Sequence, residues 1–275
     1  MLQAHNVEIS RVIVADYNGD GISFQQCRNT VIERCDCTGN TGHGFHPGSG
    51  SVGLTIREST ARKNGVDGIF FCLRVSFALV DQCDLSENGQ DGISIGHRDT
   101  DSLIRMNRME YNRRNGIYFR PDGSGQTGSR TLITGNSFRG TGRQAGSADI
   151  FIGSTVMDLH ILGNVFYDEI ALEKAPEKSP EIALEKAPEK TSEKTPERAS
   201  LPIYSQAIQN SMVVYDNRPE DRVVSSAVDP QAGIHFCRPA HELQIGPEYA
   251  DSSKSLHLGV DQTPDQMPWR CENDY

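Results

Sequence analysis

Residues 64–70 read NGVDGIF and residues 88–94 read NGQDGIS, so almost the same phrase returns after 24 residues. Related phrases return at the same interval on both sides of this pair. A fixed period of this length is typical of a solenoid, in which each repeat forms one turn that stacks on the next. Each occurrence of the phrase contains one glycine at the same place, and these marker glycines are Gly21, Gly44, Gly68, Gly92 and Gly116.

A second phrase, with apolar residues at its centre, lies upstream of each glycine. Residues 30–35 read TVIERC and residues 78–83 read ALVDQC. Helical repeats are longer and show a 3.6-residue period, so these phrases predict strands and an all-β fold. We expect a single-stranded right-handed parallel β-helix over residues 1–168, with roughly seven rungs, each rung being one complete turn of the coil. The inward apolar column is expected to be Ile32, Ile56, Val80, Ile104, Ile133 and Ile161.

Two polar columns are also expected to stack from rung to rung. Asparagine tolerates sharp corners and can hydrogen-bond to its counterpart on the next rung. In the second column, Cys35 and Cys83 occupy places where other rungs have serine or asparagine, which favours buried stacking residues over redox or metal groups. The first column is Asn18, Asn40, Asn64, Asn88 and Asn112. The second column is Cys35, Ser59, Cys83, Asn107, Asn136 and Asn164.

The repeat ends before a low-complexity segment. Residues 169–180 read EIALEKAPEKSP and residues 181–192 read EIALEKAPEKTS, a near-exact duplication rich in charge and proline. Such a composition predicts a disordered linker over residues 169–200. Residues 201–275 form a C-terminal segment, in which the stretch NSMVVYDN at 210–217 is a possible strand that rejoins or caps the coil, followed by an irregular tail.

Charge and hydropathy exclude several classes of partner. The net charge is −10, but residues 1–168 contain 16 Lys and Arg against 18 Asp and Glu, so the repeat region is nearly neutral. It lacks the basic footprint expected of a nucleic-acid-binding domain. The sequence contains no run of 18 apolar residues of the kind that predicts a membrane-spanning helix. The chain enters the repeat almost at Met1, without a signal-like segment or a cap, so we expect it to be a truncated product or one segment of a longer protein.

The phrases NGxDGIxF and GNxF resemble those of the right-handed β-helix repeat family, the superfamily with a pectin-lyase-like fold. The resemblance covers about residues 5–168. It implies a polysaccharide substrate and an extracellular or periplasmic location. Pectate lyases of this superfamily hold Ca²⁺ with three carboxylates, so Ca²⁺ is a possible cofactor, although the spacing of Asp99, Asp101 and Asp122 differs from that trio.

The candidate site follows from alternation along the strand after each glycine. Side chains of a strand point alternately to opposite faces, so the outward column is Ser23, His46, Phe70, Ser94 and Tyr118. The loops just beyond this strand differ from rung to rung, and variable loops on a regular scaffold commonly carry function. This edge gathers His46, Arg74, His97, Arg98, Asp99, Tyr118, Arg120 and Asp122.

These residue types suit an acidic polysaccharide. β-Elimination or C5-epimerisation of a uronate needs a base for the C5 proton, a cation for the carboxylate and an acid. His46 or His97 would be the base and Tyr118 the acid. Arg120 or Arg98 would clamp the carboxylate, because a guanidinium can bind it in bidentate fashion. The expected catalytic residues are therefore His46, His97, Tyr118 and Arg120, with Arg74, Arg98, Asp99 and Asp122 binding substrate.

Other interpretations remain open. Residues 42–44 read GHG, which looks like the motif of polygalacturonases, but the further motifs of those hydrolases are absent. His46-Pro47 lies where mannuronan C5-epimerases have an Asp-Pro-His-Asp/Glu motif, in altered order and without the acid. A non-catalytic β-helix that binds glycans or serves as a surface module is the main alternative to an enzyme.

Overall fold

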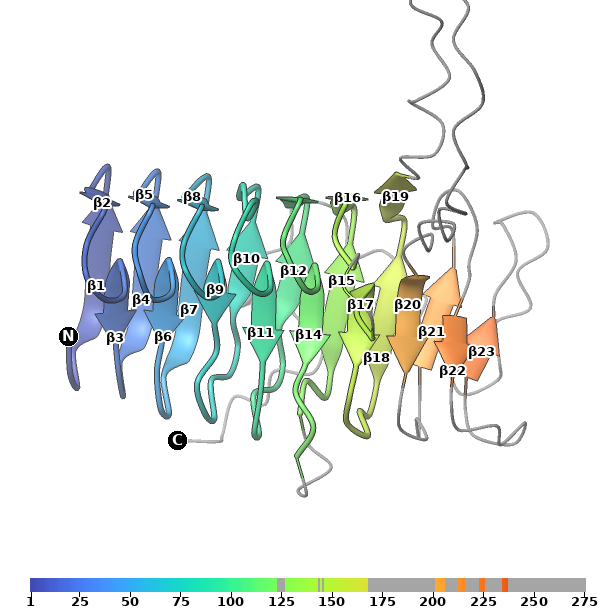
Figure 1. Ribbon diagram of the computed structural model, residues 1–275. Helices are drawn as coiled ribbons and strands as arrows, with labels where there is room; N and C mark the ends of the chain where they lie inside the picture. The colour runs from blue at the N-terminus through green and yellow to red at the C-terminus, as the bar shows by residue number, and fades with distance from the viewer. Residues whose placement is uncertain are drawn as a thin grey trace, which may run out of the picture.

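The computed structural model describes residues 1–122, 127–142, 144 and 146–167, together with the backbone of four later strands between 201 and 236. The described residues wind into a parallel β-helix of about seven rungs, about 24 residues apart, which confirms the predicted solenoid (Figure 1). None of them forms a helix long and apolar enough to cross a membrane. The predicted linker at 169–200 and the tail beyond 236 lie outside the described residues.

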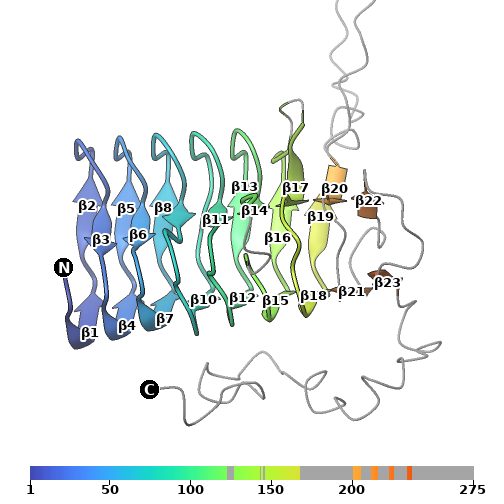
Figure 2. The ribbon, with the colours of Figure 1, turned by 90° about the horizontal axis from the view of Figure 1, so that it is seen from below.

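Each rung contributes strands to the faces of a narrow coil, which Figure 2 shows from below. One face is a nine-stranded sheet with the order β1 (His5–Ser10), β4 (Arg28–Glu33), β7 (Val52–Arg57), β10 (Leu79–Asp81), β12 (Leu103–Arg105), β15 (Thr131–Thr134), β18 (Leu159–Leu162), β21 (Met212–Tyr215) and β23 (Ile234–Phe236). A second face is an eight-stranded sheet with the order β22 (Val223–Ser225), β20 (Leu201–Ser205), β17 (Ala148–Ile152), β14 (Ile117–Phe119), β11 (Ile93–Ile95), β9 (Ile69–Phe70), β6 (Phe45–Pro47) and β3 (Ile22–Phe24). The third face has two three-stranded sheets, β2 (Ile13–Ala15), β5 (Asp36–Thr38) and β8 (Thr60–Arg62), then β13 (Arg108–Glu110), β16 (Ser137–Arg139) and β19 (Val165–Tyr167).

The predicted apolar column forms the axis of the core. Ile32 pairs with Ile56, and Ile56 pairs with Val80, in register along the nine-stranded sheet. All six residues of the column are fully buried. Because side chains alternate between the two faces of a strand, this register also fixes which residues of the sheet point outward.

The asparagine column stacks as predicted, except on the first rung. Asn64 Oδ1 accepts hydrogen bonds from the backbone N–H and the side-chain amide of Asn40, both at 3.1 Å. Asn64 Nδ2 donates to the Cys37 carbonyl at 2.9 Å. On the first rung Tyr17, not Asn18, stands in this column, because Tyr17 N–H donates to Asn40 Oδ1. Asn18 lies one residue further on, exposed, and accepts a hydrogen bond from Thr41 Oγ1.

The second polar column confirms the structural interpretation of its cysteines. Cys35 N–H donates to Ser59 Oγ, and Cys83 N–H donates to Asn107 Oδ1. The Cys83 thiol is buried between the Ile56 and Asp81 carbonyl groups. Burial raises the pKa of Cys83 to about 12, so this thiol stays protonated and unreactive.

The marker glycines are required for space rather than for an unusual φ angle. A Cβ built on Gly92 would lie 2.6 Å from the Gly116 carbonyl oxygen and 3.0 Å from Asn112 Nδ2. The same approach occurs at Gly68, where a Cβ would lie 2.7 Å from the Gly92 carbonyl oxygen. Side chains at these positions would force neighbouring rungs apart.

Replacing Asn88 by alanine should destabilise the coil by on the order of 3 kcal/mol, because the buried Asn64 N–H and Ala61 carbonyl would lose their partner. Asn18→Ala is the matched control, and its effect should stay within about 0.5 kcal/mol. Urea unfolding of both variants measures the difference. Equal losses for the two variants would contradict a stabilising ladder.

Gly92→Ala should cost about 3 kcal/mol through overpacking between rungs. Gly50 provides the comparison, because its φ is +70° but a Cβ there would meet no atom within 4 Å. Gly50→Ala should therefore cost only the backbone strain of about 1 kcal/mol. Thermal or urea unfolding of both variants measures the two losses of stability. A larger loss for Gly50→Ala than for Gly92→Ala would contradict the requirement for space at the marker glycines.

Candidate functional site

The outward column predicted on the eight-stranded sheet is present. Ser23 pairs with His46, and Ser94 pairs with both Phe70 and Tyr118. Beyond Tyr118 the column continues to Phe151 on β17. The parallel register therefore places these side chains in one row on the outer side of the sheet, one strand apart.

Arg120 is the central cation of this row. Its side chain reaches back from β14 over Gly96, where any Cβ would collide with the guanidinium. The guanidinium carbon lies 4.3 Å from the centre of the Phe70 ring. Nη1 donates to Ser94 Oγ at 2.7 Å, and Nη2 donates to the carbonyl groups of Phe71 and Cys72 at 2.5 and 3.2 Å.

Phe70 joins this cation to the two histidines of the preceding rung. The His43 ring stacks on Phe70 with centroids 4.4 Å apart, and the His46 ring meets Phe70 edge-on at 5.2 Å. Aromatic rings attract one another in stacked and in edge-on arrangements. A cation is attracted to the face of an aromatic ring. The cluster holds Arg120 and the histidines in fixed positions along the row.

His46 of the row and His97, which follows β11, are each paired with a carboxylate. His46 Nδ1 lies 2.6 Å from Asp20 Oδ2, and His97 Nδ1 lies 3.1 Å from Asp122 Oδ2. The pairs differ in exposure. His46 Nε2 is buried, and among the described residues it has no hydrogen-bond partner, whereas the His97 side chain is 43% exposed. Only His97 therefore offers its second nitrogen to a polymer on the surface.

The corner before each marker glycine also forms a ladder. Asp20 Oδ1 accepts a hydrogen bond from His43 N–H at 2.9 Å, and His43 Nδ1 accepts one from Asp67 N–H at 3.3 Å. Asp67 and Asp91 continue the series. His43 is thus part of the corner structure, and the resemblance to a hydrolase motif has a structural explanation.

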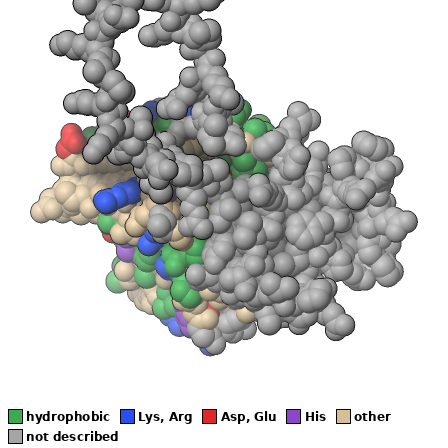
Figure 3. All heavy atoms as spheres, turned by 45° about the vertical axis from the view of Figure 1, so that its right-hand side comes forward, with side chains coloured by type: hydrophobic (Ala, Val, Ile, Leu, Met, Phe, Trp, Pro, Cys, Tyr) green, Lys and Arg blue, Asp and Glu red, His purple; other side chains and the backbone are tan. Residues whose placement is uncertain are grey.

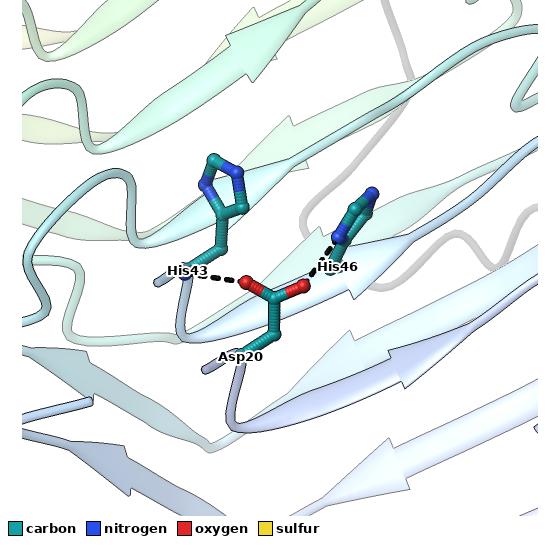
Figure 4. A group of neighbouring side chains, drawn as sticks. All are labelled: Asp20, His43 and His46. Atoms are coloured by element: carbon teal, nitrogen blue, oxygen red, sulfur yellow. Dashed lines mark hydrogen bonds and ion pairs between the residues drawn. The ribbon is translucent and has the colours of Figure 1, made fainter. Parts of the chain in front are cut away.

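Asp20, His43 and His46 form a cluster with potential metal-ligating atoms (Figure 4). One ligand atom from each residue lies within 4.8 Å of the other two. Burial opposes ionisation of Asp20, but the hydrogen bonds from His43 N–H and His46 outweigh it and hold the pKa of this carboxyl below its ordinary value. Asp20 is therefore an anion at neutral pH.

The acidic residues considered for Ca²⁺ do not gather into one group. Asp101 pairs with Arg130, and Asp122 binds His97 and Thr127. Among the residues that the structure describes, Asp20, His43 and His46 make the one group of three potential ligands.

Asp99 does not line the surface as expected for a substrate-binding residue. Its carboxylate is fully buried and accepts hydrogen bonds from the backbone N–H groups of Val75 and Gly96 at 2.8 and 2.6 Å. Burial raises the pKa of Asp99 to about 6. Arg74 and Arg98 lie at exposed corners with φ angles of +54° and +57°, beside this buried carboxyl.

Tyr118 is half-buried between Arg114, whose guanidinium carbon lies 4.7 Å from the ring centre, and Phe151. Burial raises the pKa of Tyr118, so the phenol stays protonated near neutral pH. Arg114 is held by a bidentate ion pair with Asp91. β6, β9, β11 and β14 are successive strands, so about 14 Å separates His46 from Tyr118 along the row, too far for both to act on one sugar.

The sequence interpretation therefore overlooked four members of the site: Asp20, His43, Phe70 and Arg114. Phe70 stood in the expected outward column, so the repeat itself places it beside His46. Nothing in the repeat signals that Arg120 crosses Gly96 to reach Phe70. In Figure 3, basic side chains and histidine lie among apolar side chains on the coloured part of the visible surface.

The profile of the family described as "Right handed beta helix region" matches residues 1–166. Two solved structures share the architecture at 12% sequence identity. The A-module of the mannuronan C-5 epimerase AlgE4 from Azotobacter vinelandii has a TM-score of 0.55, over 84% of this chain and 58% of the epimerase chain. The surface adhesin PfbA from Streptococcus pneumoniae has a TM-score of 0.53, over 86% of this chain and 60% of the adhesin chain. The present chain thus spans less than two thirds of either relative, and no curated protein sequence matches it.

The raised pKa of Asp99 should make the free energy of unfolding depend on pH. The folded carboxyl keeps its proton up to about pH 6, whereas the unfolded one loses it near its ordinary value of 3.8. The folded state therefore binds more protons between these values, and the stability contributed by this group falls as pH rises from about 4 to 6. Urea unfolding across this range should show a steeper decline for the wild type than for Asp99→Asn, which does not titrate. Parallel curves would show that Asp99 ionises normally.

Proposed function

We propose that this chain, which belongs to the right-handed β-helix family, binds an extended acidic polysaccharide along its outward row and removes the C5 proton of a uronate unit. Successive strands lie ~4.8 Å apart, close to the length of one sugar unit, so a polymer lying along the row meets equivalent positions at successive sugars. The fold shared with a mannuronan C-5 epimerase module agrees with a carbohydrate-related role.

The observation that carries the proposal is the pairing of partly exposed His97 with the largely buried Asp122 carboxylate. The Asp122 carboxylate at 3.1 Å fixes the proton on Nδ1 and leaves Nε2 as an acceptor. An imidazole nitrogen that is free to accept a proton at the surface can serve as a general base. His46 is less suitable, since its Nε2 is buried.

Arg120 would stabilise the negative charge that develops on the uronate carboxylate when the C5 proton leaves. A guanidinium has five N–H donors, and three of those of Arg120 already bind Ser94 and the carbonyl groups of Phe71 and Cys72. Arg120 therefore acts through its charge and its remaining N–H groups rather than as the bidentate clamp first expected. Exposed Arg98, next to His97, is free to complete carboxylate binding in the bound complex.

Tyr118, on the strand next to β11, would be the proton donor. In β-elimination, His97 takes the C5 proton, the C4–O bond breaks, and the phenol protonates the departing oxygen as the C4–C5 double bond forms. In epimerisation, the C4–O bond remains and C5 receives a proton on its opposite face. The raised pKa of Tyr118 keeps the proton available for either step.

A non-catalytic glycan-binding role is the second candidate. The same fold occurs in a pneumococcal surface adhesin. Arg74 and Arg98 are exposed cations beside the row and would contact a polyanion without any proton transfer.

Purified protein should act on alginate, pectate or a glycosaminoglycan, measured as unsaturated uronate by ultraviolet absorbance and as C5 deuterium incorporation by NMR in D₂O. His97→Ala should lower the rate by on the order of 10²–10⁴-fold. Asp122→Asn should lower it less, and His5→Ala, an exposed histidine on β1 of the other sheet, should leave it unchanged.

Binding without product or exchange would replace the enzyme by the glycan-binding module. Neither binding nor activity with any of these acidic polymers would eliminate both candidates. A wild-type rate in His97→Ala would remove His97 as the base.

A further inference from the structure

The cluster of Asp20, His43 and His46 has no part in the proposed proton transfer. It lies at the β3 and β6 end of the row, two strands from β11, which His97 follows. Three ligand atoms nevertheless lie within 4.8 Å of one another, and His46 turns Nδ1 toward Asp20 (Figure 4).

The surroundings of His43 are those of a supported metal ligand. His43 Nδ1 lies 3.3 Å from Asp67 Oδ2 and faces Asp67 rather than His46. Metal-binding histidines generally give one ring N–H to a carboxylate or carbonyl group, which orients the other nitrogen toward the ion. His43 Nδ1 is equally distant from the Asp67 N–H, from which it accepts in one tautomer, and from Asp67 Oδ2, to which it donates in the other. Metal binding requires the second tautomer, in which Nδ1 carries the hydrogen and Nε2 is the ligand atom.

Asp20 is likewise held in place. Its Oδ1 accepts the His43 N–H, and its Oδ2 lies beside His46 Nδ1 at 2.6 Å. The stacked contact of His43 and the edge contact of His46 with Phe70 restrict both rings.

We propose that Asp20, His43 and His46 bind a divalent transition-metal ion of the Zn²⁺ class. Two imidazole nitrogens and one carboxylate oxygen form a donor set typical of zinc with an open fourth position, whereas Ca²⁺ requires mainly oxygen ligands. Zinc–ligand bonds of about 2.0–2.1 Å place tetrahedral ligand atoms roughly 3.3 Å apart, so the cluster needs shifts of no more than about 1.5 Å to close on an ion.

The corner column supports a special role for His43. Its equivalents on the following rungs are Asp67, Asp91 and Asn115, each of which accepts a hydrogen bond from the next rung. Asparagine or aspartate thus satisfies this corner, and histidine occurs on the rung that also carries His46. The same column supplies a matched variant, His43→Asn, which preserves the acceptor and removes the imidazole.

Calorimetric titration of the metal-free full-length chain with ZnCl₂ tests the proposal. His43→Asn and His46→Ala should each weaken binding by about 10²-fold or more, and Asp67→Asn by about 10–100-fold. His97→Ala should bind Zn²⁺ as the wild type does, because the His97–Asp122 pair lacks a second histidine. Thermal unfolding without metal establishes that each variant is folded.

Substitution by Co²⁺ separates this site from the cysteines of the chain, since thiolate ligands add intense charge-transfer bands that a nitrogen and oxygen site lacks. A spectrum with those bands, equal affinity in His43→Asn, or no binding by the wild type would each overturn the proposal. The measurement needs no polysaccharide, so failure of the proposed activity leaves its outcome unaffected. Conversely, Zn²⁺ binding that survives in an inactive His97→Ala variant would support both assignments independently.

Discussion

The close stacking of one rung on the next is the constraint on which the rest of the structure depends. Backbone groups pair across ~4.8 Å, and no bulky group can lie between rungs at the corners. Buried amide side chains satisfy the corner backbone groups, as Asn64 does for Asn40 and Cys37. Because such groups are costly when unpaired in the interior, the polar ladders enforce register as strongly as the isoleucine column does.

The same constraint creates the outward row. Once inward residues are in register, every outward residue is placed in a row, and residues distant in sequence become neighbours. His46, Phe70 and Tyr118 are brought into line in this way. The partly exposed His97–Asp122 pair lies beside the row, and the more buried cluster of Asp20, His43 and His46 lies at one end of it, so one surface carries two chemically distinct groups.

The fold could be predicted almost entirely from the sequence, because the same residue pattern recurs on several rungs and each recurrence supports the same assignment. The inward column, the cysteine slots and the outward column were all predicted correctly. Asn18 was the exception, since the first rung is one residue shorter and Tyr17 takes its place. The site could be predicted only in part. A column in the sequence places the Cα atom of a residue but does not show how far its side chain extends, and the Arg120 side chain extends across Gly96. The burial of Asp99 depends on the path of the neighbouring corners, which the repeat does not specify.

The pairing of β20 with β17 has a consequence for how this protein tolerates change in length. Residues 168–200 separate β19 from β20, yet Ile203 pairs with Ile150 and the sheet continues in parallel register. Each rung is stabilised only by contacts with its immediate neighbours, so residues inserted at a corner do not disturb the hydrogen bonds between strands of the coil. Doubling the length of such an insertion costs only about 0.6 kcal/mol in loop-closure entropy. The coil can therefore accept a second copy of a segment, such as residues 181–192, while its strands keep their register.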